Sequence, residues 1–138
     1  MKLELVHKNN QLFHIIHNEG DEEIKFWDNN NSWGWGNIQI IVKTSQQEII
    51  ITQKLKIFTR NGPSYIIIPP NSTYEYGLNI NKENWEYNLT SENEETEIFS
   101  KIIIKETKES QELGVFTGTL KSNTLKIKDN LLSEIFKI

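Results

Sequence analysis

Residues that favour tight turns recur along the whole chain, about every eight to twelve residues. Asn, Gly, Pro and Asp accept the backbone angles that such turns need. The clearest clusters are Asn9-Asn10, Asn18–Asp21, Thr44–Gln47, Thr59–Pro63 and Pro69–Ser72. Turns at this spacing are typical of an all-β sandwich or barrel. We expect a sandwich, because connections of mixed length suit a Greek key better than a simple meander.

Between the turns, apolar and polar residues alternate as they do in half-buried strands. The longest such run spans residues 74–80, and a second one places Trp85, Tyr87 and Leu89 on one face. The chain contains no alanine, and isoleucine is its commonest apolar residue. Alanine is the best helix former, whereas isoleucine and the aromatic residues fit a pleated sheet. We therefore expect one domain over residues 1–138 with about eight strands.

Three further segments have weaker patterns. Glu48–Phe58 is expected to form one long strand with a bulge or bend near Thr52-Gln53. Glu106–Glu112 is expected to be a charged turn, and residues 113–117 the strand that follows it. The apolar residues of Leu131–Ile138 have helical spacing, so this tail is either one or two helical turns or an edge strand.

The three histidines His7, His14 and His17 lie in the first expected hairpin. With Asn9-Asn10 as its two-residue turn, His7 pairs with Leu12 and His14 pairs with Leu5. His17 then points to the other face, so the three rings cannot bind one zinc ion. We expect surface or half-buried histidines without a metal. Asp28–Ser32 resembles the start of a calcium loop, but Trp33 and Gln39 stand where an EF-hand has Gly and Glu.

Composition excludes several classes of function. The chain has no cysteine, which excludes disulfides, Cys-ligated zinc and thiol catalysis. Its net charge is −4 and Arg60 is its only arginine, whereas nucleic-acid binding needs a basic face. No apolar run is long enough for a membrane helix, and Met1–Lys8 alternates like a strand rather than a signal peptide. We expect a cytoplasmic protein that binds neither nucleic acid nor membrane.

Catalytic motifs are also missing from the sequence. It contains no G-x-S-x-G, H-E-x-x-H, G-x-G-x-x-G or P-loop pattern. Its carboxylates lie mostly in turns, and their spacing pairs no two of them as a general acid and base. We expect a protein that is not an enzyme and that needs no cofactor.

The four tryptophans are the most distinctive side chains. Trp85 belongs to an alternating strand and is expected in the core. Trp33 and Trp35 lie in a short loop where Gly34, Gly36 and Asn residues flank them, so both cannot easily be buried. Exposed aromatic residues on a sandwich either stack on sugar rings or anchor a protein partner.

Three features together resemble a known group of proteins. They are Trp33-Gly34 after a short strand, the turn Thr59–Pro63, and Ile68–Ser72 leading into a strand that precedes Trp85. The pattern is similar, over residues 1–128, to small bacterial immunoglobulin-like sandwiches, which include the intracellular proteinase inhibitors. Those domains commonly begin a central strand with Pro-Gly, where this chain has Asn71 in place of the glycine. The resemblance implies an immunoglobulin-like Greek-key sandwich.

The expected function is binding of another protein, as an inhibitor or as an immunity protein that neutralises a toxin. Loops at one end of a sandwich are natural binding surfaces. The expected contact residues are Trp33, Trp35, Arg60 and Tyr65. One alternative is a carbohydrate-binding module in which Trp27, Trp33 and Trp35 form the stacking platform. Another is a structural subunit that self-associates through an edge strand.

Overall fold

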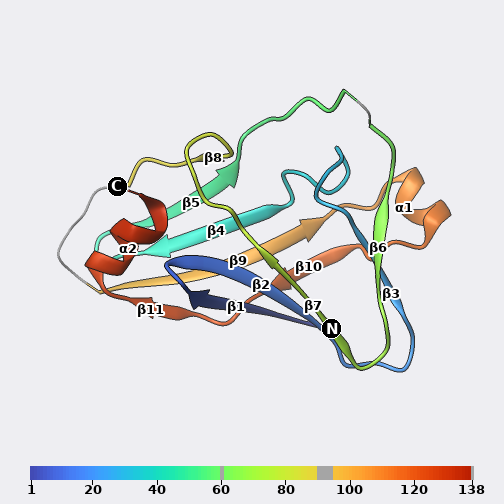
Figure 1. Ribbon diagram of the computed structural model, residues 1–138, viewed down its shortest axis with the longest axis horizontal. Coiled ribbons are helices and arrows are strands. Elements are labelled where there is room, and N and C mark those ends of the chain that lie inside the picture. The colour runs from blue at the N-terminus through green and yellow to red at the C-terminus, as the bar shows by residue number, and fades with distance from the viewer. Residues whose placement is uncertain (60, 90–94, 138) are drawn as a thin grey trace.

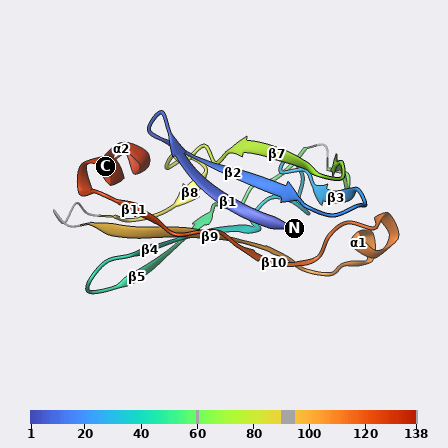
Figure 2. The ribbon, with the colours of Figure 1, turned by 90° about the horizontal axis from the view of Figure 1, so that it is seen from below.

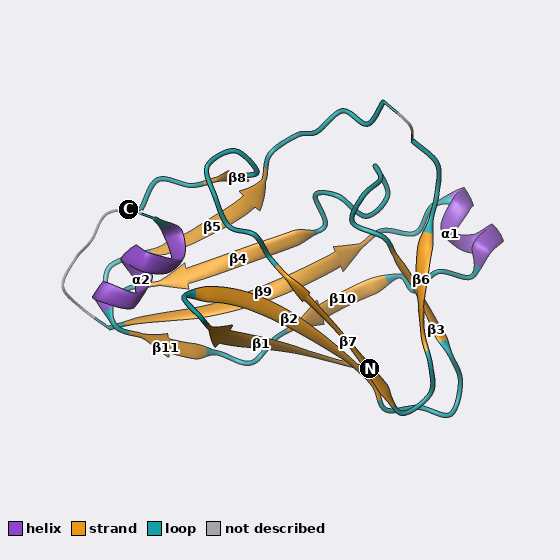
Figure 3. Cartoon of the chain, viewed as in Figure 1, coloured by secondary structure: helices purple, strands orange, loops and turns teal. Residues whose placement is uncertain are grey.

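The expected all-β class is confirmed by the computed structural model, which describes residues 1–59, 61–89 and 95–137 (Figures 1 and 3). These residues form eleven strands and two short helices. The strands are β1 (Lys2–Lys8), β2 (Gln11–Asn18), β3 (Ile24–Trp27), β4 (Ile38–Lys43), β5 (Glu48–Gln53), β6 (Tyr65–Ile68), β7 (Ser72–Gly77), β8 (Trp85–Glu86), β9 (Thr96–Ile104), β10 (Gly118–Lys121) and β11 (Leu125–Ile127). The helices are α1 (Lys108–Leu113) and α2 (Asp129–Phe136).

Two antiparallel sheets lie face to face (Figure 2). The larger has the strand order β10-β9-β4-β5-β8, and β11 pairs with the other end of β9 on the β10 side. The smaller has the order β1-β2-β7. Strands β3 and β6 form a separate ribbon beside α1, and α2 lies at the opposite end of the molecule (Figures 1 and 2). Neither described helix is long and apolar enough to span a bilayer.

The core fills the space between the two sheets. The larger sheet contributes the alternating residues Ile38, Ile40 and Val42, and the smaller contributes Leu5 and Leu12, all buried. Each such side chain stabilises the fold by about 1.5–3 kcal/mol through removal from water. Trp85 is 1% exposed and its indole N–H donates to the carbonyl of Leu78 at 3.1 Å. The prediction that Trp85 belongs to the core is confirmed.

The first hairpin has the predicted register. Asn9 and Asn10 both have positive φ, 52° and 58°, as a two-residue hairpin turn requires. His7 pairs with Leu12, and Leu5 pairs with His14. Asn71, in the turn before β7, also has a positive φ of 54°. Asparagine tolerates this conformation better than other residues with a Cβ, so these turns could be predicted from their residue types.

One side of the sandwich is joined by a single side chain. Asn123 lies between β10 and β11, where its Oδ1 accepts from the Leu5 N–H at 2.8 Å. Its Nδ2 donates to the Leu5 carbonyl at 3.2 Å. The Asn123 side-chain amide thus bonds to β1 as the backbone of a neighbouring strand would. It connects the edge of β1 to the larger sheet.

The strand expected over Glu48–Phe58 is shorter than predicted, because β5 ends at Gln53. Its neighbour β4 begins at Ile38, and Gln39 already lies opposite Thr52. Beyond Gln53 there is no strand left to pair with, since the chain before β4 turns away as a loop. The following residues are not a bent continuation of the strand, and they run along the edge of the molecule (Figure 1).

The charged turn expected over Glu106–Glu112 is wrong, because helix α1 begins at Lys108. Thr107 caps it: its side chain accepts from the Ser110 N–H while the Ser110 side chain accepts from the Thr107 N–H. Gly114 ends it with a left-handed φ of 70°. The strand expected over 113–117 is likewise absent, and the described strand begins at Gly118. For the C-terminal tail, the helical alternative is confirmed by α2.

Candidate functional site

The loop that carries Trp33 and Trp35 is held by the buried side chain of Asn31. Asn31 is 2% exposed; its Oδ1 accepts from the N–H groups of Trp33 and Gly34 at 2.9 and 3.0 Å. Its Nδ2 donates to the carbonyl and hydroxyl of Ser64. A Cβ at Gly34 would lie 1.9 Å from the Asp28 carbonyl oxygen, so only glycine fits there. The loop therefore presents its two tryptophans in a fixed arrangement.

Trp33 lines one cavity beside this loop. The ring is partly buried against Trp27, with 6.1 Å between ring centroids. The cavity has a volume of about 400 Å³. Its lining residues are Trp27, Ser32, Trp33, Gly36, Asn37, Gln39, Ile103, Lys105 and Thr107. Trp27 itself is only 3% exposed, so the three-tryptophan sugar platform is not formed as expected.

Trp35 lines a different cavity, between the ends of β5 and β7. Its indole N–H donates to the Lys54 carbonyl at 2.6 Å. The cavity has a volume of about 180 Å³. Its lining residues are Asn29, Asn30, Trp35, Ile38, Gln53, Lys56, Tyr76, Gly77, Leu78, Asn79 and Asn84. Trp33 and Trp35 therefore serve separate surfaces, although only Gly34 separates them in the sequence.

The Lys54–Phe58 segment, which follows β5, passes along the rim of the Trp35 cavity. Its start is fixed, because the Lys54 N–H donates to the Asn84 carbonyl at 2.8 Å and Trp35 binds the Lys54 carbonyl. The Lys56 ammonium lies 4.9 Å from the centre of the Trp35 ring. Leu55 and Ile57 are 104% and 94% exposed. Two large aliphatic side chains are thus exposed to water on a segment whose start is fixed at Lys54.

The other two expected contact residues lie elsewhere. Tyr65 opens β6 opposite Trp27 and is partly buried, with the Lys25 ammonium 5.1 Å from its ring centre. Trp33 and Tyr65 thus flank Trp27, whereas Trp35 faces the second cavity. Arg60 lies outside the described residues. Leu55 and Ile57 were missed as candidates, because their alternation was interpreted as a continuing strand.

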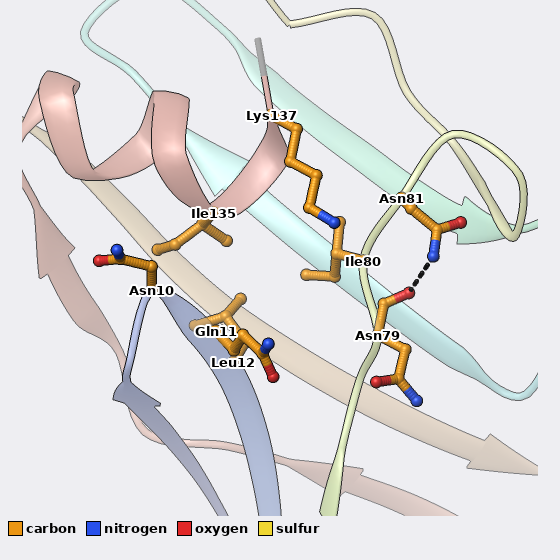
Figure 4. Close-up of a pocket in the computed structure, with 8 residues that line it drawn as sticks. All are labelled: Asn10, Gln11, Leu12, Asn79, Ile80, Asn81, Ile135 and Lys137. Atoms are coloured by element: carbon orange, nitrogen blue, oxygen red, sulfur yellow. Dashed lines mark hydrogen bonds between the residues drawn. The ribbon is translucent and has the colours of Figure 1, made fainter.

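A third cavity, of about 110 Å³, lies between the Asn9-Asn10 turn and the end of α2 (Figure 4). Leu12, Ile80 and Ile135 give it apolar walls, and amide side chains and Lys137 surround them. The Asn81 amide donates to the Asn79 carbonyl at 3.2 Å (Figure 4). Among the described residues that line this cavity, Lys137 is the only titratable one, so they offer no acid–base pair.

A polar cluster lies inside the core around His14, which is 0% exposed rather than at the surface or half-buried as expected. Its Nδ1 is 2.8 Å from the Tyr76 hydroxyl, and its Nε2 is 2.6 Å from the Ser100 hydroxyl on the facing sheet. Burial lowers the pKa of His14 to about 3 and raises the pKa of Tyr76, which nearby Tyr74 raises further. Ser100 is also 0% exposed. The Ser–His contact therefore joins the two sheets in a place that a substrate cannot reach.

The other histidines and acidic residues form no metal centre in the part of the chain that the structure describes. His17 lies on the outer face of β2, where its Nε2 is 2.9 Å from a Glu4 carboxylate oxygen. Asp28 accepts from the Asn30 N–H at 3.0 Å and so stabilises the start of its own loop.

No protein-family model matches this chain, no curated protein matches its sequence, and no solved structure matches its fold.

Proposed function

We propose that this chain is a non-catalytic protein-binding module that contacts its partner through Trp35 and the Lys54–Phe58 segment. One observation carries the proposal: Leu55 and Ile57 are fully exposed although their segment is anchored at Lys54. Ordered apolar patches on a soluble protein mark interaction sites more often than neutral surface. Removal of each side chain from water on binding would contribute about 1.5–3 kcal/mol.

Anchoring makes this segment suitable for binding. A flexible loop loses conformational freedom when it binds, and that loss weakens the complex. Here the contacts of Lys54 with Asn84 and Trp35 already restrict the start of the segment. The Lys56 ammonium contacts both the Trp35 and the Phe58 ring, at 4.9 and 5.5 Å from their centres. Trp35 thus supports the segment and also provides an aromatic surface for the partner to contact.

The same proposal includes an immunoglobulin-like topology for the sandwich and a role as an inhibitor or immunity protein. We take the sandwich to be related to the small bacterial immunoglobulin-like domains, in which loops at the ends of the sheets bind other proteins. A domain of this kind that occupies the surface of a proteinase or a toxin acts as an inhibitor or an immunity protein. Neither role requires a nucleophile, a metal or a cofactor.

The experiment is affinity capture from a lysate of the cells that make the protein, with the captured chains identified by mass spectrometry. Wild type should retain one protein in stoichiometric amount, and Leu55→Ser/Ile57→Ser should lose it. Ile67→Ser is the matched control, because Ile67 is also an exposed isoleucine, at 49%, but lies on β6. Equal capture by the double variant and by wild type would refute the proposed surface.

Carbohydrate binding is the second candidate, favoured by the amides of the Trp35 cavity. The side chains of Asn29, Asn30, Asn79 and Asn84 line it and donate no hydrogen bond to the described residues. Free amides beside an indole ring are suited to sugar hydroxyls. A titration with common polysaccharides that changes the fluorescence of wild type but not of Trp35→Phe would support this candidate over the first.

A further inference from the structure

The charge of the Lys54–Phe58 segment differs from that of the rest of the chain. Between Glu48 and Glu75 the sequence contains no acidic residue, and its basic residues there are Lys54, Lys56 and Arg60. The chain as a whole has a net charge of −4. Neither Lys54 nor Lys56 belongs to an ion pair with any residue that the structure describes. Their charges are therefore available to an acidic partner.

The backbone of the same segment is also available. Beyond the two bonds at Lys54, no backbone N–H or C=O from Leu55 to Thr59 is hydrogen-bonded to a described residue. The segment follows β5 directly and leaves the larger sheet beside its short edge strand β8 (Figure 1). Unpaired backbone groups near a sheet edge are available to a strand from another protein.

We infer that the partner contributes an extended strand in which acidic and aliphatic residues alternate, and that this strand pairs with Leu55–Thr59. The inference rests on the proposed function. In an extended chain Leu55 and Ile57 share one face and Lys54 and Lys56 share the other. An alternating partner strand would place its aliphatic side chains against the first face and its carboxylates against the second. A second copy of this chain is disfavoured, because antiparallel pairing would bring lysines together.

The test uses a short capped peptide of alternating Glu and Val, added to isotope-labelled full-length protein and followed by amide NMR. The amide signals of Leu55, Ile57 and Thr59 should shift, and their exchange with solvent should slow. A peptide of alternating Lys and Val should bind about ten-fold more weakly, because two attractive charge pairs become repulsive. A Glu/Val peptide with a central proline should also bind more weakly, since proline cannot donate its backbone hydrogen bond.

A charge exchange provides the decisive control. Lys54→Glu/Lys56→Glu should reverse the preference, so that the Lys/Val peptide binds more tightly than the Glu/Val peptide. Lys56 is exposed and Lys54 is only partly buried, so the variant should fold. Equal binding of the two peptides by wild type, shifts confined to other strands, or no shift with about 1 mM Glu/Val peptide would overturn strand addition.

The remaining outcomes separate this inference from the function on which it rests. If vesicles of phosphatidylglycerol and phosphatidylcholine shift the Leu55 and Ile57 signals while the peptides do not, the surface binds membranes and both proposals fall. If affinity capture finds a partner that depends on Leu55 and Ile57 while the peptides fail, protein binding stands and strand addition falls.

Discussion

At the scale of single residues, the loop that carries Trp33 and Trp35 depends on side chains that lie beneath it. The buried Asn31 side chain accepts from the Trp33 and Gly34 N–H groups, and the Asn31 backbone carbonyl accepts from the Trp35 N–H. Gly34 lets the backbone approach Asp28 closely. Such contacts determine where Trp33 and Trp35 point. They could not be predicted from the sequence, because Asn31 and Gly34 look like ordinary loop residues until Ser64 and Asp28 are placed beside them.

Replacement of Gly34 by alanine should destabilise the protein. The new Cβ would meet the Asp28 carbonyl oxygen at 1.9 Å, and backbone atoms cannot move aside as a flexible side chain does. We expect a loss of about 1–3 kcal/mol in the free energy of unfolding, measured by urea denaturation. Gly62→Ala is the matched control, because nothing lies within 4 Å of its Cβ position. Equal stability of both variants would show that the loop is not tightly packed.

Stability should also depend on pH through His14. Its pKa is lowered from 6.5 to about 3 by burial, so the unfolded chain binds a proton at mildly acidic pH while the folded chain does not. The stability that comes from keeping His14 neutral is therefore fully present above pH 6.5. It is lost progressively as the pH falls from 6.5 toward 3, because protonation then favours the unfolded chain. The free energy of unfolding should decrease by about 2 kcal/mol between pH 7 and pH 5.

Urea denaturation across this pH range measures the effect. His14→Gln should be less stable at pH 7 but should lack this component of the slope, since glutamine does not titrate. A slope in His14→Gln equal to that of wild type would assign the pH dependence to other groups.

At the scale of elements, local patterns predicted the strands well and their ends poorly. The Asn9-Asn10 hairpin was predictable in type and register because turn and pairing lie within adjacent residues. The end of β5 was not, because it depends on where β4 begins, at Ile38. Helix α1 was missed because it is short and charged and buries only Ser110, so no apolar period marks it. Its signal was the capping pair of Thr107 and Ser110 with Gly114 beyond.

The boundary of β5 gives a prediction about stability. Leu55→Ser and Ile57→Ser should each change the free energy of unfolding by less than about 0.5 kcal/mol, because both side chains are already in water. Ile51→Ala, in the core of the same strand and 0% exposed, should lose about 2–5 kcal/mol. Urea denaturation of the three variants distinguishes them. A large loss for Leu55→Ser would mean that the segment packs against the fold.

The capping of α1 gives a second prediction at this scale. Thr107→Ala removes the side chain that accepts from the Ser110 N–H at 3.1 Å and should destabilise the protein by about 1 kcal/mol. Thr124→Ala, at an exposed position between β10 and β11, should have little effect on stability, measured for both variants as the melting temperature. Indistinguishable melting temperatures for the two variants would mean that α1 contributes nothing to the cooperative unit.

At the scale of the whole molecule, the two sheets, their joined edge at Asn123 and the core around Trp85 form a stable support for one exposed surface. The all-β class was predictable from the alternation and the turns. The position of the surface formed by Trp35 and the Lys54–Phe58 segment was not predictable. It depends on a contact between the end of β5 and Trp35, which are too far apart in the sequence for a local pattern to connect them. The expected aromatic anchors included Trp35, whereas the aliphatic pair Leu55 and Ile57 was recognised only from the structure.

The central claim is that a protein partner binds the Lys54–Phe58 segment, and a hydrogen-exchange footprint of the complex tests it most directly. The backbone amides of Leu55–Phe58 have no hydrogen-bond partner among the described residues, so they should exchange rapidly in the free protein. On binding of the captured partner, we predict that exchange slows at these residues and around Trp35. Unchanged exchange there, with protection confined to the Trp33 cavity or to the ribbon of β3 and β6, would contradict the account.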